Sequence, residues 1–154
     1  MSKLKSPLCI DVSEILALPE GEYCEITIHQ QVAGIDSPET LSSNKADITA
    51  ELKIIKIKKG IYLMISGVVM LQLICARCLN IFFHEFKFNI DAVASYWISD
   101  NQIKIENDKI DIYPILCETV LLNIPTKPLC DINCKGICQN CGKNLNSNGC
   151  KCQK

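Results

Sequence analysis

The last quarter of the chain is rich in cysteine and constrains the fold more than any other stretch. Six of the eleven cysteines lie between positions 130 and 152, and one further pair, Cys75 and Cys78, lies far upstream with two residues between them. A C-x-x-C-G turn directs two thiolates at one metal ion, and its glycine, here Gly142, relieves the turn sterically. A segment of Lys, Asn, Gly and Cys cannot bury enough apolar area to order itself, so a bound ion would have to order it.

The spacing places four cysteines in one set, the number of ligands that Zn²⁺ takes in a structural site, and the count leaves four for a second set. Which four cysteines share each metal is open in the sequence. One set is closed within the tail, whereas the other ties the tail back to the body. The set within the tail is Cys138, Cys141, Cys150 and Cys152. The set that joins the tail to the body is Cys75, Cys78, Cys130 and Cys134. A full tetrad leaves no open coordination position, which argues against metal catalysis. We therefore expect two structural Zn²⁺ ions per chain.

So many cysteines would also suit a disulfide-bonded secreted protein. The first residues lack an uninterrupted apolar stretch and a cleavage site, and no uncharged run reaches the ~20 apolar residues of a membrane span. We therefore expect a cytoplasmic protein, in which C-x-x-C pairs are metal ligands or redox dithiols. A thiol-redox or metal-handling protein that uses these pairs is the alternative to a structural zinc protein.

The charge balance does not indicate a general nucleic-acid clamp. The formal net charge is −1, and eight thiolates around two Zn²⁺ ions would bring it to about −5. Residues 126–154 nevertheless carry five lysines against one carboxylate, Asp131. Two zinc tetrathiolates, each about −2, would roughly cancel that local excess. The candidate contacts to RNA or to a partner are Arg77, Lys135, Lys143 and Lys151.

Arg77 is the only arginine of the chain and lies between two of the expected zinc ligands. It could offset the negative charge of the bound thiolates. It could also present its planar guanidinium to a phosphate or to a partner carboxylate. The sequence leaves both roles open.

Alternating apolar residues predict an antiparallel sheet. The predicted strands cover residues 8–12, 23–29, 48–57, 61–73 and 82–90, and a continuation over 93–98 is open. The run Lys58-Lys59-Gly60 predicts a hairpin turn, with Gly60 able to take a positive φ. A shift of the apolar pattern to Ile55 and Ile57 predicts a bulge. The strand over 61–73 is apolar on both faces, so we expect it at the centre of the sheet with both faces covered.

Two helices complete the predicted fold. Ser13 is a candidate N-cap for a short helix over 14–18 that Pro19 ends. The main helix begins near Ile112, with Asp108 or Asp111 as a candidate cap, and ends before Pro125. Polar stretches over 32–45 and 100–108 predict loops.

The fold class that follows is α+β. It consists of an antiparallel sheet with one main covering helix, a short N-terminal helix and a zinc-stabilised tail. Residues 1–125 form the body, and residues 126–154 form a zinc-binding tail that packs against Cys75 and Cys78.

No enzyme site is visible in the sequence. His29 and His84 are the only histidines, and the cysteines outside the two sets are Cys9, Cys24 and Cys117. A Cys–His nucleophile pair would be expected with a strained elbow or a Gly-rich oxyanion turn, and neither accompanies these residues. Cys117 lies in the apolar main helix and is expected to behave as a small hydrophobic residue.

The cysteine motifs together resemble those of the YceD-type family, bacterial and plastid proteins described as large ribosomal RNA subunit accumulation proteins. The run C-A-R-C-L from Cys75, the tail motif around C-x-x-C-G, and the L-L-N-I-P that ends at Pro125 carry the likeness, which spans about residues 48–152. By this resemblance the family positions are Cys75, Cys78, Cys134, Cys138, Cys141, Cys150 and Cys152. Two departures are Gln139, where the family usually has proline, and a less acidic stretch from Cys117 to Val120.

This resemblance implies a non-enzymatic factor needed for normal levels of 23S ribosomal RNA, acting in ribosome biogenesis in the cytoplasm. Its expected partner is ribosomal RNA or a large-subunit ribosomal protein. Whether RNA or protein is touched directly is open at this stage, as is the oligomeric state.

Overall fold

The computed structural model describes residues 8–33, 35, 45–97, 102–147 and 150–152. Within that part of the chain, five strands form one sheet in the order β2-β3-β4-β5-β6. They are β2 (Tyr23–Ala33), β3 (Lys45–Ile57), β4 (Gly60–Ile74), β5 (Ile81–Ser95) and β6 (Ile103–Lys104). The first four are antiparallel neighbours, and β6 pairs with β5 in parallel.

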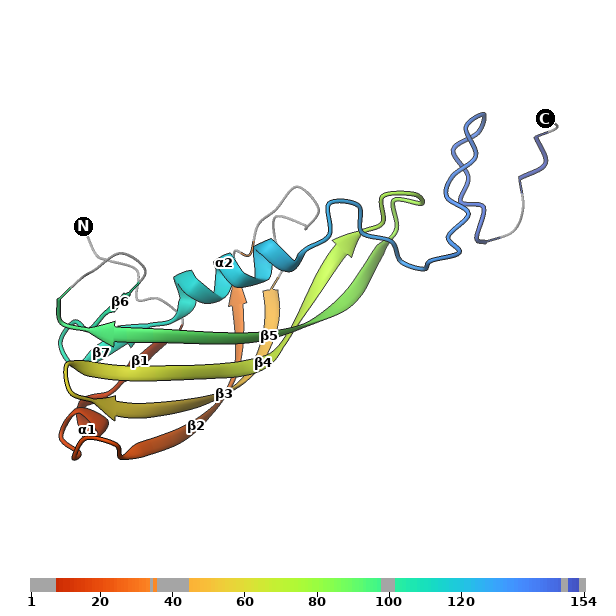
Figure 1. Ribbon diagram of the computed structural model, residues 1–154. Helices are drawn as coiled ribbons and strands as arrows, with labels where there is room; N and C mark the ends of the chain where they lie inside the picture. The colour runs from red at the N-terminus through yellow and green to blue at the C-terminus, as the bar shows by residue number, and fades with distance from the viewer. Residues whose placement is uncertain (1–7, 34, 36–44, 98–101, 148–149, 153–154) are drawn as a thin grey trace.

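The remaining elements lie on one side of this sheet. Strand β1 (Cys9–Asp11) pairs antiparallel with β7 (Lys109–Asp111), and the helices are α1 (Ser13–Leu16) and α2 (Tyr113–Asn123). The sheet curls around α2, so that the end of β2 and the start of β3 rise behind the helix (Figure 1). Leu116 and Val120 of α2 are buried against it. The predicted α+β class, with an antiparallel sheet and one main covering helix, is confirmed.

Strand β4 lies at the centre of the sheet as predicted, but the expectation that both its faces are covered is wrong. Leu63 and Ile65 are fully buried on the helix side, whereas Met64 on the other side is 44% exposed. Val68 and Met70 on that open side are only partly buried. The reason is that α1, α2 and the β1–β7 pair all pack on one face, so apolar residues on the second face stay in contact with solvent.

The register of β3 is unbroken, so the predicted bulge at Ile55 and Ile57 is wrong. Ile54 pairs with Leu63, Ile55 with Tyr62, and Ile57 with Gly60, each one position along. The apolar pattern shifts because Ile55 and Ile57 lie half-buried on the open face. The hairpin turn is confirmed, with Gly60 at φ +151°.

The strand ends differ from prediction where the local sequence is polar. Strand β2 extends to Ala33, and β5 continues to Ser95, which confirms its open continuation over the first part of 93–98. The predicted loop over 100–108 contains the short strand β6 and a Glu106–Lys109 bridge. Parts of the predicted loops, residues 34, 36–44 and 98–101, lie outside the described residues.

Carboxylates begin both helices. The Asp111 carboxylate accepts a hydrogen bond from the Tyr113 backbone N–H at 3.0 Å. The N-cap of α2 is Ile112, however, so neither predicted cap, Asp108 or Asp111, occupies that position. In α1, the N-cap is Val12, so the prediction of Ser13 as the cap is wrong: Ser13 is the first helical residue, and its backbone N–H donates to the Asp11 carboxylate at 3.0 Å. The hydrogen bond from the Ser13 hydroxyl, followed by the one from the Ser13 backbone N–H, lowers the pKa of the Asp11 carboxyl.

Strands β4 and β5 form a long hairpin that reaches past the body, and the turn with Cys75 and Cys78 lies at its tip (Figure 1). The chain after α2 runs along this hairpin and continues beyond its tip into the cysteine-rich tail. This placement sets the position of the candidate site. None of the described helices has the length and apolar character needed to cross a membrane.

Candidate metal centre

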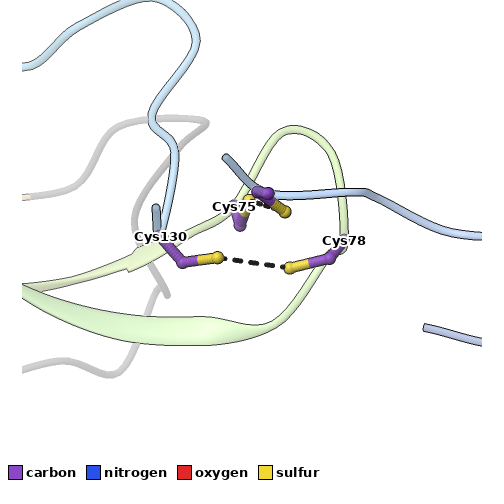
Figure 2. A group of neighbouring side chains, drawn as sticks. Cys75, Cys78 and Cys130 are labelled. Atoms are coloured by element: carbon purple, nitrogen blue, oxygen red, sulfur yellow. Dashed lines mark hydrogen bonds between the residues drawn. The ribbon is translucent and has the colours of Figure 1, made fainter. Parts of the chain in front are cut away.

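The first cluster joins the hairpin tip to the tail. Cys75 and Cys78 come from the turn, and Cys130 and Cys134 come from the tail. The Sγ atoms of Cys75 and Cys134 are 3.8 Å apart, and those of Cys78 and Cys130 are 3.5 Å apart. Figure 2 shows the Cys130 sulfur directed at that of Cys78. All four sulfurs lie within 4.8 Å of one another, and a tetrahedron with Zn–S bonds of about 2.3 Å has edges of about 3.8 Å.

Backbone hydrogen bonds shape this turn and attach the tail to it. The Leu79 N–H donates to the Cys75 carbonyl at 2.9 Å, with Leu79 at φ +59°. The Ala76 N–H donates to the carbonyl of Pro128 at 2.8 Å. The tail therefore meets the hairpin through main-chain contacts as well as through sulfur.

Arg77 clamps the tail onto the turn. Its Nη1 donates to the carbonyl of Cys134 at 3.1 Å and to that of Ile132 at 3.3 Å. The sequence left two roles open for Arg77. The structure places its cation beside the first cluster, where it can offset the thiolate charge. It also adds hydrogen bonds to the tail that the spacing of the cysteines did not indicate. Contact with a phosphate stays a prediction.

The second cluster lies within the tail. The Cys150 sulfur is 3.2 Å from that of Cys138 and 3.3 Å from that of Cys141, and Cys152 completes the group. The turn from Cys138 to Gly142 is closed by the Gly142 N–H, which donates to the Cys138 carbonyl at 2.8 Å, with Gly142 at φ +69°. Cys141 and Cys152 are exposed, so this cluster is more open to solvent than the first, where three of four members are buried.

Asn146 connects the part of the tail after Cys141 to the first cluster. Reasoning from the sequence missed this residue. Its side-chain N–H donates to the Cys134 sulfur at 3.2 Å, and its side-chain oxygen accepts the Lys135 N–H at 2.7 Å. Groups that hydrogen-bond a metal ligand fix its orientation. They follow no fixed spacing, so no signal in the sequence pointed to this residue.

The first cluster favours the thiolates of Cys75 and Cys134 and disfavours those of Cys78 and Cys130, as the direction of each pKa shift shows. Burial would raise the pKa of Cys75, but backbone N–H groups of Cys130, Cys78 and Arg77 donate to its sulfur and lower that pKa to about 6. The hydrogen bond with the neighbouring Cys78 sulfur, followed by burial, raises the pKa of Cys130 to about 12. Four thiolates would therefore be present together only with a cation between them.

The second cluster shows the same division. Backbone N–H groups of Cys141 and Asn140, together with the Cys150 thiol, lower the pKa of Cys138 to about 6. Hydrogen bonds with the sulfurs of Cys150 and then Cys141 raise the pKa of Cys152 to about 12. A preformed thiolate at Cys138 beside the protonated thiol of Cys152 is suited to capture a soft cation, which then displaces the remaining proton.

The structure thus brings the eight cysteines together in the two expected groups of four, and each group could hold a metal ion. Four sulfurs at tetrahedral spacing fit Zn²⁺, which favours thiolates and needs no other ligand in a structural site. Zinc would be held by Cys75, Cys78, Cys130 and Cys134 in the first group and by Cys138, Cys141, Cys150 and Cys152 in the second. The identity of the metal and these ligand roles stay predictions.

A family model described as "Large ribosomal RNA subunit accumulation protein YceD" matches residues 64–154. The chain belongs to the YceD family. The matched segment begins inside β4 and includes β5, α2 and all eight clustered cysteines of the YceD chain. It confirms the resemblance, although the match starts later than the expected residue 48. Searches among curated proteins and among solved structures gave no match.

The other cysteines of this YceD chain lie outside both clusters. Cys9 is exposed on β1, whereas Cys24 and Cys117 are partly buried. Burial raises the pKa of Cys24 and of Cys117. Both are therefore protonated at neutral pH and pack as small hydrophobic side chains, as the sequence indicated for Cys117.

The predicted lysine contacts of the YceD tail are all exposed. Lys135, Lys143 and Lys151 lie on the tail, Lys135 next to a first-cluster cysteine and Lys151 between two cysteines of the second. Their ammonium groups can therefore reach an external anion. That they contact RNA or a partner stays a prediction.

Arg77→Ala is expected to loosen the tail of the YceD chain from the hairpin without removing a sulfur. The variant loses the hydrogen bonds to Ile132 and Cys134, each about 1.5–3 kcal/mol for a charged donor. We expect at least tenfold faster release of metal from the first cluster, measured with a chromophoric chelator. Lys135→Ala removes an exposed cation nearby and is the control, with unchanged release. Equal rates in the two variants would show that Arg77 does not hold the tail.

Proposed function

We propose that this protein is a non-enzymatic factor for the accumulation of large-subunit 23S ribosomal RNA, acting in ribosome biogenesis in the cytoplasm. It would bind ribosomal RNA or a ribosomal protein of the large-subunit precursor through its zinc-stabilised tail. Membership of a family described by large ribosomal RNA subunit accumulation supports the process. The observation that carries the site is the first cluster, because it joins the tail to the β4–β5 hairpin through four sulfurs.

The geometry of the tail supports a binding role. Two metal-ordered loops would give a polar segment a fixed shape that it could not reach by apolar burial alone. Lysines are exposed around both clusters, and Ile132 beside the first is 83% exposed. A rigid surface with cations and an apolar side chain can contact phosphates and partner side chains together.

The arrangement of the sulfurs supports a structural use of the metal. A catalytic zinc keeps one coordination position for water or substrate. Here each cluster supplies four sulfurs, which fill a tetrahedral ion. The ions would therefore hold the tail in place, and the side chains around them would contact the ribosomal precursor.

Disrupting the second cluster is expected to remove the protein from ribosomal precursors. The Cys138→Ser, Cys141→Ser double variant loses two of four sulfurs, so the outer part of the tail loses its shape. We expect at least a tenfold fall in the fraction that co-sediments with large-subunit precursors in a sucrose gradient, with lower 23S ribosomal RNA in cells. Crosslinking of the wild-type protein then identifies whether RNA or protein is touched.

Cys9→Ser is the matched control, since Cys9 is an exposed cysteine far from the clusters in sequence. Its co-sedimentation should equal that of the wild type. Unchanged association of the double variant would contradict the proposal. Easily exchanged metal together with a reversible Cys75–Cys78 disulfide under mild oxidation would instead favour the thiol-redox or metal-handling alternative.

A further inference from the structure

Strand β2 is an edge of the five-stranded sheet, with β3 as its neighbour. It is 11 residues long, contains no proline or lysine, and carries Glu25 as its one charged side chain. Among the described residues, none pairs with its outer side. Long edge strands usually carry prolines, lysines or bulges that prevent pairing with another chain. This strand lacks such features along its length.

The backbone groups available at this edge can be assigned. Across β2 and β3, the Lys56 N–H donates to the Glu22 carbonyl at 2.8 Å, so these two residues form a hydrogen-bonded pair. Hydrogen-bonded pairs alternate along an antiparallel ladder. The even-numbered residues of β2 therefore direct their backbone groups at β3, and the odd-numbered residues, Thr27 among them, direct theirs outward.

The side chains at this edge show that the core is incomplete there. Cys24, Ile26 and Ile28 face the covered side of the sheet but are only partly buried, although they pack against the core. Helix α2 lies mainly against β5, and α1 lies mainly against β3. A further strand beside β2 would satisfy the backbone groups and cover these apolar side chains.

We propose that β2 pairs antiparallel with β2 of a second copy of this chain, with Thr27 opposite Thr27 on the two-fold axis. In this register Ile26 lies opposite Ile28 on the covered face, twice by symmetry. On the open face Glu25 lies opposite His29. Cross-strand apolar pairs and hydrogen-bonded polar pairs of this kind stabilise antiparallel sheets.

The polar side chains of the open face fit this register. His29 contacts the Thr49 hydroxyl through Nδ1 at 3.1 Å, which leaves Nε2 to donate to the Glu25 carboxylate of the other copy. Centring the pair on Ile28 instead would place Ile26 opposite Gln30 and Glu25 opposite Gln31, with neither the apolar pair nor the Glu25–His29 pair. A C2 contact needs such self-complementarity, since each residue meets its partner twice. The product is one sheet continuous through both copies.

Thr27→Pro tests the contact on the full-length protein. Proline removes an N–H that points outward and is tolerated at that position of an edge strand. It deletes both symmetric Thr27 hydrogen bonds, so we expect the dimer dissociation constant to rise at least a hundredfold by sedimentation equilibrium. Thr27→Val keeps the N–H and the strand preference and should stay within about threefold of wild type. Circular dichroism confirms that each variant is folded.

Amide hydrogen exchange of the wild type decides independently, even if Thr27→Pro does not fold. The proposal expects protection of the Thr27 and His29 amides that increases with protein concentration. A monomer at every concentration would overturn it, as would a dimer whose affinity Thr27→Pro leaves unchanged. Protection of these amides that is independent of concentration would show that another segment of the same chain covers the edge, and would overturn it too.

Discussion

Cys134→Ser is expected to reduce the bound metal by about one equivalent per chain and to free the tail from the hairpin, while the five-stranded sheet stays folded. Cys134 is the buried tail member of the first cluster, 3.8 Å from Cys75 and hydrogen-bonded by Asn146. Structural zinc sites contribute about 10–16 kcal/mol of binding free energy, so loss of one ligand is a large effect. The apolar core lies in the sheet and helices, away from this site.

Two measurements on the same sample check this prediction. Metal analysis gives the number of ions per chain, and amide exchange gives the order of the tail and of β3 to β5 separately. We expect fast exchange at Ala76 and Cys134, whose N–H groups are bonded to Pro128 and Asp131 in the structure. Cys9→Ser should change neither readout. Protected Ala76 and Cys134 amides in a Cys134→Ser variant that has lost this metal equivalent would refute the role of the ion.

Cys152→Ser separates the two clusters. Cys152 is an exposed member of the second cluster, so its loss should remove the other metal equivalent and leave the Ala76 and Cys134 amides protected. Loss of both metals from this variant would mean that the clusters fold as one unit. The comparison therefore tests the grouping of the cysteines as well as the presence of metal.

The second cluster was predictable because its four ligands obey local spacing, whereas the first cluster was assigned as the four cysteines that remained. Two sulfurs separated by two residues face one point, and the short C-x-C pair at Cys150 completes a set within the tail. Arg77 and Asn146 were different. Arg77 was singled out for its charge, yet its donation to the Cys134 carbonyl depends on how the tail crosses the hairpin. Contacts between distant segments leave no periodic pattern in a sequence.

The fold was predictable where the apolar periodicity extends over many residues. It was misread where an apolar residue is compatible with either a covered or a solvent-facing position. The pattern of β4 correctly gave a central strand, but Met64 and Met70 on its second face did not require cover, because single apolar side chains are common at surfaces. In the predicted loop over 100–108, Ile105 is buried and leads into β7, where Ile110 is also buried. Strands of two or three residues carry too few alternations for the period to be recognised.

Gly60→Ala is expected to destabilise the body by about 3 kcal/mol or more, a larger effect than at any exposed glycine. Gly60 takes φ +151°, a conformation almost restricted to glycine that costs other residues about 1–3 kcal/mol. A Cβ at this position would also lie 2.1 Å from the Ala94 carbonyl oxygen, so β5 would have to move away from the turn between β3 and β4. For a domain of this size we expect a fall in Tm of roughly 10 °C.

Gly21→Ala is the matched control that isolates the steric part of this effect. Gly21 also has a positive φ, +92°, but a Cβ there would meet nothing within 4 Å. Its substitution should therefore cost about 1–2 kcal/mol of backbone strain alone. The difference between the two variants, measured by urea unfolding with the same m-value, reports the close approach of β4 to β5. Equal losses of unfolding free energy would mean that the Ala94 backbone moves at little cost. The close approach of the β3–β4 turn to β5 would then not require glycine at position 60.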